Sequence, residues 1–246
     1  MTNLDYKQFT RRHRPHIHPP GALLFVTYRL VGSVPKSTVR EYKAKKVWLE
    51  NELKRARGQA RDNKAPELEK WIERIETFNR EWFLKFEAIL HQAKVGPMWM
   101  RDERVAEAVA DSLRVLDGNA YRLDTYSVMS NHVHTIFKPF VSESNLREIK
   151  NNDGHPVFTS DYPGISRIMH SVKGRSAREC NLILSRSGSF WEHESFDHVI
   201  RPGKLKATMR YVLNNPVKAG LAKHWREWPW NYCRKELSDK LSLSSR

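Results

Sequence analysis

The sequence predicts an α+β fold in which an antiparallel sheet of four strands carries helices on one face. Three observations in the 246-residue chain lead to this prediction. Short runs rich in β-branched and aromatic residues indicate strands. Longer stretches place apolar residues at helical spacing. The elements follow one another as β-α-β-β-α-β, the order of the ferredoxin-like architecture, and one more helix comes after them.

The first strand is expected at Leu23 to Leu30, where a nearly continuous apolar run indicates burial. A long, highly charged helical region then interrupts the pattern. A basic helix over Thr38 to Ala56 and a helix with an apolar stripe over Glu67 to Gln92 predict a helical hairpin. We expect it as an insertion at about 36–96 in one domain that spans 1–246. The sequence leaves open whether this insertion only packs or adds a basic binding surface.

The other elements follow from the same two periodicities. Asp117 and Gly118 close an amphipathic helix, and a polar loop over 141–163, with weak helical content at 145–150, precedes the next one. The remaining predicted elements are a helix over Arg104 to Leu116, strands over Tyr121 to Met129 and His132 to Lys138, a helix over Ile165 to Asn181, a strand over Phe190 to Ile200, a helix over Lys204 to Asn214, and a basic, Trp-rich tail at about 222–246.

The charge balance points to a polyanionic partner. Lys and Arg number 43 against 28 Asp and Glu, a net charge of +15. Nucleic acid is the commonest partner of that kind, and an acidic membrane surface is the second. No run is apolar enough to span a membrane, and Met1 to Arg14 lack the apolar core of a secretory signal. Two cysteines argue against a disulfide scaffold or a cysteine-based zinc site and favour a reducing cytoplasm.

His132 and His134 form a His-x-His pattern in the third predicted strand. Because residues two apart on a strand point to the same face, the two imidazoles should stand side by side, with Val133 on the other face. Two such imidazoles can hold a divalent metal ion and leave positions open for a substrate oxygen. Two ordinary strand histidines are the alternative. His16 and His18 repeat the spacing among prolines, where packing or nucleic-acid contact is favoured over metal binding.

Tyr211 and Asn215 lie four residues apart at the end of the last predicted helix, so both should project over one surface. Pro216 ends that helix. A phenol beside an amide oxygen suits a site in which the amide helps to hold a metal and the phenol attacks a group that the metal binds. Taken alone, the helix is better explained by a tyrosine at a buried edge and an asparagine that terminates the helix.

Together, the two stretches resemble the REP-associated tyrosine transposases, which are single-tyrosine HUH transposases. The resemblance spans roughly residues 11–232. Ser130 and Phe196 depart from the family, which often has Pro and Tyr there, at positions to which no chemistry is assigned. The resemblance rests on an ordered set of blocks: Pro19 to Leu30, the His-hydrophobic-His strand, Gly188 to Arg201, and Asn214 to Leu221 followed by Trp228-Pro229-Trp230.

The resemblance implies the same fold and an enzyme that cleaves and transfers single-stranded DNA beside palindromic hairpins. It implies that Tyr211 attacks the backbone and stays joined to the 5′ phosphate. It also implies that His132, His134 and Asn215 hold Mg²⁺ or Mn²⁺. We expect a cytoplasmic, nucleoid-associated protein with no membrane partner. The hairpin sequence and the oligomeric state, monomer or homodimer, stay open.

Basic side chains on several elements are candidates for DNA contacts, and solvated surface charge is an equally good explanation for those outside the N-terminal arm. His193 and His198 lie five apart on the last predicted strand and should face opposite sides, so one of them is a candidate for facing the site. The candidate DNA-binding residues are Arg11, Arg12, Arg14, Lys173, Arg175, Arg201 and Lys218.

Three other functions fit parts of the sequence. A non-catalytic hairpin-binding protein on the same fold would have no need of the Tyr, His, His and Asn set. An RNA-binding ferredoxin-like module would carry paired aromatic residues in an RNP pattern, whereas the corresponding strand here carries histidines. A metal-dependent hydrolase that uses water would release a free 5′ phosphate, and Tyr211 would then be only structural.

Overall fold

The computed structural model describes residues 21–59, 66–140, 146–150, 156–160 and 164–242. Contacts divide the chain into two compact units. One unit contains the main sheet, and the other consists of Leu30–Met98, which follow the first strand.

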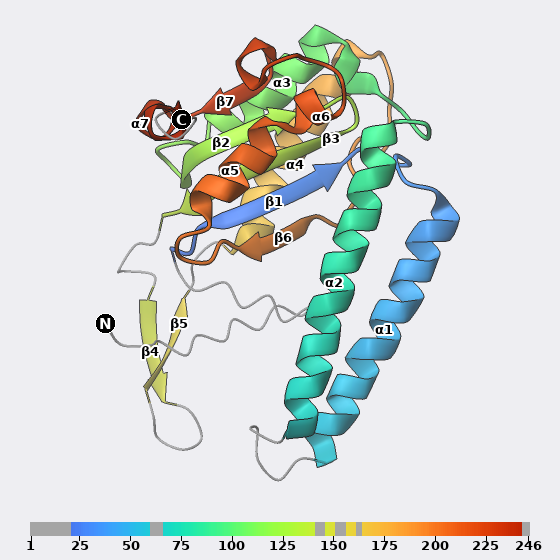
Figure 1. The fold of residues 1–246 in the computed structure, drawn as a ribbon, viewed down its shortest axis with the longest axis vertical. Coiled ribbons are helices and arrows are strands. Elements are labelled where there is room, and N and C mark those ends of the chain that lie inside the picture. The colour runs from blue at the N-terminus through green and yellow to red at the C-terminus, as the bar shows by residue number, and fades with distance from the viewer. Residues whose placement is uncertain (1–20, 60–65, 141–145, 151–155, 161–163, 243–246) are drawn as a thin grey trace. The chain divides into compact units, whose positions relative to one another are not determined.

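The first unit is built on an antiparallel sheet that has five strands among the described residues (Figure 1). Its order is β6-β1-β3-β2-β7. The prediction of an α+β fold with an antiparallel sheet is confirmed, and the prediction of four strands was wrong by one. The strands are β1 (Leu24–Arg29), β2 (Tyr121–Val128), β3 (His132–Pro139), β6 (Phe196–Val199) and β7 (Asn231–Cys233).

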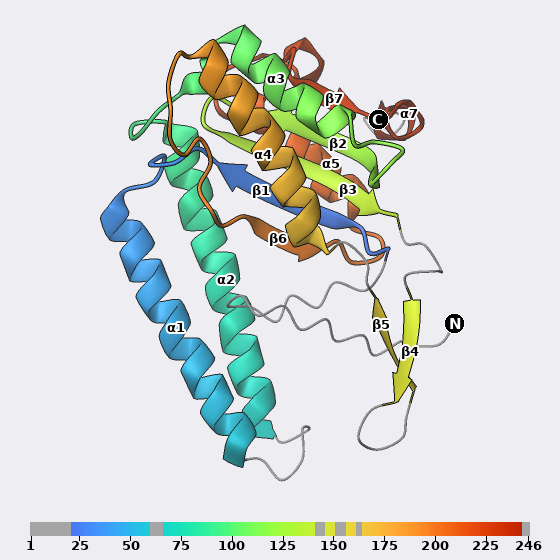
Figure 2. The same ribbon diagram turned by 180° about the vertical axis from the view of Figure 1, so that it is seen from behind.

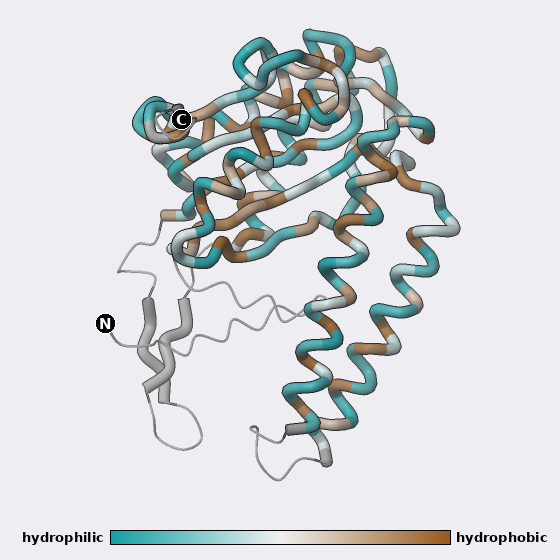
Figure 3. Tube along the Cα trace, in the orientation of Figure 1, coloured by the Kyte–Doolittle hydropathy of each residue, from teal (hydrophilic) through white to brown (hydrophobic). Residues whose placement is uncertain are grey.

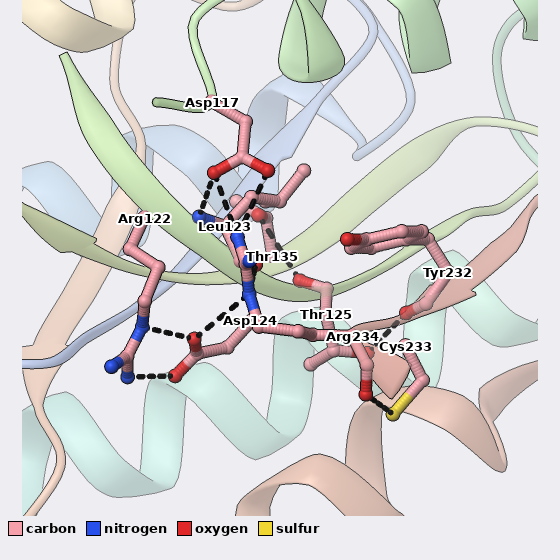
Figure 4. A network of polar contacts seen from close by, with 9 residues as sticks. All are labelled: Asp117, Arg122, Leu123, Asp124, Thr125, Thr135, Tyr232, Cys233 and Arg234. Atoms are coloured by element: carbon pink, nitrogen blue, oxygen red, sulfur yellow. Dashed lines mark hydrogen bonds and ion pairs between the residues drawn. The ribbon is translucent and has the colours of Figure 1, made fainter. Parts of the chain in front are cut away.

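The fifth strand, β7, comes from the segment that the sequence suggested was only a tail. Tyr232 lies opposite Tyr126 of β2, and the two rings stack with centroids 5.3 Å apart. Next to this pair, the Arg234 guanidinium donates to both carboxylate oxygens of Asp117, at 2.8 and 2.9 Å (Figure 4). Asp124, fully buried, accepts two hydrogen bonds from Arg122. This polar network fixes β7 against β2 through contacts that are distant in the sequence.

Helices cover both faces of the sheet. Figures 1 and 2 show α5 on one face, across β2 and β3, and α3 and α4 packed together on the other. The helices of this unit are α3 (Glu103–Arg114), α4 (Ile165–Ile183), α5 (Leu205–Leu213), α6 (Asn215–Lys218) and α7 (Lys235–Ser242), with short 3₁₀ turns η1 (Trp99–Arg101) and η3 (Trp225–Glu227).

Alternate residues of β1 separate the two faces, as expected for a strand. Tyr28 packs edge-on against Trp191, whose indole N–H donates to Ser176 of α4 at 3.0 Å. Phe25 faces the other way and contacts Tyr211 of α5, with ring centroids 6.0 Å apart. The α3–α4 face therefore carries the Tyr28–Trp191 pair, and the α5 face carries the Phe25–Tyr211 pair.

Two predicted elements differ from the structure. The loop expected to have weak helical content at 145–150 instead contributes β4 (Leu146–Lys150), which pairs with β5 (Pro156–Ser160) in a two-stranded antiparallel sheet. The strand expected from Phe190 begins only at Phe196. Phe190 is buried, but it stacks on Trp99 at 5.3 Å between centroids, so its burial comes from core packing and not from a strand.

The second unit confirms the predicted helical insertion after the first strand. It forms a hairpin of α1 (Lys36–Gln59) and α2 (Pro66–Gln92). Figure 3 shows hydrophobic residues recurring among hydrophilic ones along both helices. At the aromatic core, Tyr42 of α1 stacks nearly parallel on Phe78 of α2, with centroids 5.5 Å apart. No helix in the described part of the chain is long and apolar enough to cross a membrane.

Glycine closes the base of this hairpin. Gly96 has a φ of +80°, and a Cβ on it would lie 2.3 Å from the carbonyl oxygen of Gly32. No side chain fits such a contact with the backbone. Gly32 and Gly96, at the two ends of the hairpin, therefore touch.

Candidate active site

His132 and His134 stand side by side on β3, on the face that α5 covers. Their Nε2 atoms are 3.1 Å apart, and their ring planes are nearly perpendicular. The two side chains are 1% and 0% exposed, so the pair is removed from bulk water. Two ring nitrogens at this separation point into one small volume.

Each histidine is held at its other ring nitrogen. His132 Nδ1 lies 2.7 Å from Oδ1 of Asn131, the residue before it. His134 Nδ1 lies 2.7 Å from Oγ1 of Thr27, which the pairing of β1 with β3 places directly opposite. Such partners orient imidazoles that bind metals and select their tautomer.

These contacts restrict where the protons can be. Because an amide oxygen only accepts, His132 carries its proton on Nδ1 and presents a lone pair at Nε2. A second lone pair on His134 Nε2, 3.1 Å away, would repel it unless a proton or a cation lay between them. The Thr27 hydroxyl can donate to His134 Nδ1 in the first case and accept from it in the second. The pair therefore fits a divalent cation without any change in its hydrogen-bond partners.

Tyr211 reaches this pair from α5. Its ring meets the His134 ring edge to face, with centroids 5.8 Å apart, and it is half-buried. The Lys218 ammonium, from α6, lies 4.6 Å from the centroid of the Tyr211 ring. The structure thus brings together Tyr211, the histidine pair and Lys218, all of which the sequence had singled out.

Asn215 is fully buried where α5 gives way to α6. Its Nδ2 donates to the carbonyl oxygen of Tyr211 at 2.9 Å, one helical turn back, so this amide fixes the helix end that carries the tyrosine. Pro216 lies in the first turn of α6, where a proline is well tolerated because it needs no N–H partner. Within the described residues, Asn215 Oδ1 has no hydrogen-bond partner. A buried oxygen of this kind is a suitable ligand atom for a cation.

Of the two histidines on the last predicted strand, His198 lies on the site face. Its ring packs against Phe25 with centroids 5.0 Å apart, and Phe25 also contacts His134 and Tyr211. Partial desolvation by neighbouring groups lowers the pKa of His198 below its ordinary value, while the residue keeps an exposed surface. His193 precedes β6 and is exposed.

The candidate DNA contacts lie in different surroundings. Lys173 donates to the carbonyl oxygens of Glu192 and His193 at 2.6 and 3.0 Å and to Ser195 Oγ at 3.2 Å. Burial, followed by the charge of nearby Arg29, lowers the pKa of Lys173 to about 8. The lysine therefore holds the segment before β6 in place.

Arg175, Arg201 and Lys218 are exposed, and Arg175 forms a 3.8 Å ion pair with Asp111. The charge of Arg201 also lowers the pKa of His198, by less than desolvation does, so Arg201 lies close to the site face. Arg11, Arg12 and Arg14, together with His16 and His18, lie outside the described residues.

Sequence reasoning missed Thr27 and Asn131. Asn131 precedes His132 directly, and that adjacency was the available signal. Thr27 had none, because only the register of β1 against β3 places it opposite His134.

No protein-family model matches the chain, and no curated protein matches it. A solved structure of a REP-associated tyrosine transposase bound to a REP hairpin matches 95% of this chain and 87% of its own. The sequence identity is 13% and the TM-score is 0.42. The chain is thus similar in structure to a REP-associated tyrosine transposase.

Proposed function

We propose that the protein is a metal-dependent single-strand DNA transposase whose Tyr211 forms a 5′-phosphotyrosine intermediate on DNA next to palindromic hairpins. One observation carries the proposal: the Tyr211 ring lies against His134, whose Nε2 atom is 3.1 Å from that of His132. The buried, unsatisfied oxygen of Asn215, four residues after Tyr211, supports it. A tyrosine with a purely structural role would need neither the histidine pair nor the unsatisfied Asn215 oxygen.

The strand order also supports a ferredoxin-like core. β6-β1-β3-β2, with α3 between β1 and β2 in the chain and α4 between β3 and β6, is the arrangement of that fold. On this interpretation α5 and β7 are additions. α5 brings the tyrosine to the face that carries the histidines.

The reaction conserves the energy of the bond that it breaks. The Tyr211 oxygen forms a bond to phosphorus while the bond to the 3′ oxygen breaks, so the phenol loses a proton and the 3′ oxygen gains one. A later attack by a DNA hydroxyl on the phosphotyrosine releases Tyr211 and joins the strands. Because an ordinary tyrosine has a pKa of about 10, the phenol needs help at neutral pH. The Lys218 ammonium, 4.6 Å from the centroid of the Tyr211 ring, places a positive charge beside it.

His132, His134 and Asn215 are the residues that would hold the metal. Two imidazole nitrogens and one amide oxygen form a mixed set that suits Mn²⁺ or Mg²⁺. A divalent ion there would polarise a phosphate oxygen and stabilise the departing 3′ oxygen. Thr27 and Asn131 keep the imidazoles oriented toward it.

The +15 charge supports hairpin DNA as the partner and a place near the nucleoid. The residues proposed to contact phosphates are the same as those inferred from the sequence. Lys173 is the weakest of these candidates because its ammonium already donates hydrogen bonds to protein atoms. The candidates are Arg11, Arg12, Arg14, Lys173, Arg175, Arg201 and Lys218.

The test is covalent trapping. Wild-type protein, Tyr211→Phe and Tyr126→Phe are incubated with a labelled DNA hairpin carrying a single-stranded flank and Mn²⁺, and protein–DNA adducts are separated on a denaturing gel. Tyr126 is the control because its hydroxyl accepts from Arg114 at 3.1 Å, away from the histidines. We expect adducts with wild type and Tyr126→Phe and none with Tyr211→Phe, which should still bind the hairpin. Normal adduct formation by Tyr211→Phe would falsify the assignment.

Other products would identify the alternatives. Hairpin binding without cleavage in any metal would indicate a non-catalytic binding protein. A free 5′ phosphate with no adduct would indicate water as the nucleophile. Replacing His132 and His134 by Ala should remove Mn²⁺ binding, and the same change at His16 and His18 should not.

A further inference from the structure

Within the α1–α2 hairpin only α1 has a net positive charge. α1 contains eight Lys and Arg against three Glu, a net charge of +5. α2 contains four Lys and Arg against six Glu, a net charge of −2. A helix that needed charge only for solubility would have no reason to collect one sign while its neighbour collects the other.

Ion pairs engage the acidic residues of α1 and leave other basic residues of this helix exposed. Each glutamate of α1 has a basic partner: Glu41 pairs with Lys85 of α2 at 3.2 Å, Glu50 with Lys46 at 3.9 Å, and Glu52 with Arg55 at 2.7 Å. The acidic residues of α1 are thus neutralised locally. Four further cations of α1, here named the basic stripe, are all exposed: Lys36, Arg40, Lys43 and Lys54.

The basic stripe lies on one side of α1. At about 3.6 residues per turn its four members fall within an arc of about 60°. The opposite side of α1 buries Tyr42, Leu49 and Leu53. From Lys36 to Lys54 the stripe runs about 27 Å, at about 1.5 Å per residue. Three of its cations lie in the first turns of α1 and Lys54 lies near the end, with the exposed Val47 between them on the same side.

Cations spaced along one side of a straight helix match a rod-shaped polyanion. Phosphates of duplex DNA repeat every ~3.4 Å along the axis of each strand, so the stripe spans about 8 base pairs. Single-stranded DNA would instead call for an open aromatic platform. The nearest exposed aromatic residue, Trp48, has the Lys45 ammonium 4.1 Å from its ring centroid and Trp71 edge-on at 5.8 Å. The ring of Trp48 therefore already contacts Lys45 and Trp71 and is a poorer platform for an unpaired base, which favours a duplex.

We propose that the basic stripe binds the phosphate backbone of duplex DNA, without regard to sequence. That this duplex is the stem of the hairpin substrate rests on the function proposed above. The stripe would then hold the stem while a separate site acts on the single-stranded flank.

Fluorescence anisotropy with two matched double variants tests this. Arg40→Gln with Lys43→Gln removes one arginine and one lysine from the stripe. Lys70→Gln with Arg80→Gln removes the same pair of residue types from exposed positions on α2. The probes are hairpins with stems of about 4 and about 12 base pairs, shorter and longer than the stripe, and an unpaired strand of equal length. Thermal unfolding confirms that both variants keep the fold.

We expect the stripe variant to bind the long stem at least about tenfold more weakly, with the slope of log K against log salt reduced by about 2. The control should change less than about twofold, and the short stem and the unpaired strand should discriminate little between the variants. Equal losses in both variants, or an unchanged salt slope in the stripe variant, would overturn the proposal. If the slope of log K against log salt is unchanged in the stripe variant, an acidic protein becomes the expected partner of the basic stripe.

Failure of the proposed function gives a different pattern. If Tyr211 forms no adduct, the long duplex should still bind in a stripe-dependent manner. If adducts form normally but duplex binding ignores the stripe, only the stripe proposal fails.

Discussion

Thr27→Val tests the histidine pair with the smallest change of shape. Valine fills nearly the volume of threonine but replaces the hydroxyl that lies 2.7 Å from His134 Nδ1. Thr27 is 6% exposed and His134 is 0% exposed, so water does not readily replace the lost partner. The variant therefore removes one hydrogen bond and the means by which the protein sets the tautomer of His134.

Two magnitudes follow from that geometry. A buried polar atom left unsatisfied costs about 1–3 kcal/mol of folding free energy. Loss of a partner behind a metal ligand typically lowers metal affinity about 10–100-fold, or about 1.4–2.7 kcal/mol. Affinity falls because His134 without Thr27 no longer favours the tautomer that presents its Nε2 lone pair.

The assay is Mn²⁺ binding, followed by the loss of the free-ion electron paramagnetic resonance signal and by calorimetry, alongside thermal unfolding. Thr135→Val is the matched control. Thr135 is also buried and follows His134 directly on β3, but its hydroxyl donates to the carbonyl oxygen of Thr125 at 3.3 Å. We expect both variants to lose stability and only Thr27→Val to lose Mn²⁺ affinity. Wild-type affinity in Thr27→Val, or an equal loss in Thr135→Val, would refute the reasoning.

Three further predictions concern charge. Asp124→Ala should lower the free energy of unfolding by about 1.5–3 kcal/mol, since it removes the two hydrogen bonds from Arg122 to a buried carboxylate, whereas Asp111→Ala, at an exposed ion pair, should cost under about 1 kcal/mol in denaturant titrations. Because burial lowers the pKa of Lys173 from 10.5 to about 8, the unfolded chain binds more protons between those values. Wild type should therefore gain about 1–3 kcal/mol over Lys173→Met as pH rises from 8 to 10.5, and a flat difference would contradict that shift. From the +15 charge, hairpin affinity should fall at least about tenfold between roughly 50 and 200 mM salt in binding titrations.

Elements with a strong local pattern were predictable. The α1–α2 hairpin, β3 and α5 all carry their periodicity in the sequence, and the structure has them within a few residues of the predicted ends. The placement of His132 and His134 on one face also followed from local geometry alone. Such features depend on near neighbours, which a sequence displays directly.

Features that depend on distant partners were not predictable. β7 has three residues and too little local β propensity to be recognised, and it forms because Arg234 reaches Asp117 while Tyr232 meets Tyr126. Thr27 is likewise invisible until strand register is known. Weak helical content was expected at 145–150, but pairing with β5 overrode that weak preference.

The contact between Gly32 and Gly96 has an evolutionary consequence. Because both ends of the helical hairpin meet backbone to backbone, the rest of the chain needs only a tight turn where the hairpin departs and returns. Insertions whose ends lie close together add little strain to their host and little entropy cost of closure. The α1–α2 hairpin can therefore be lengthened, shortened or exchanged in evolution without changes to the strand that precedes it. Selection can thus act on the α1–α2 hairpin separately from the rest of the molecule.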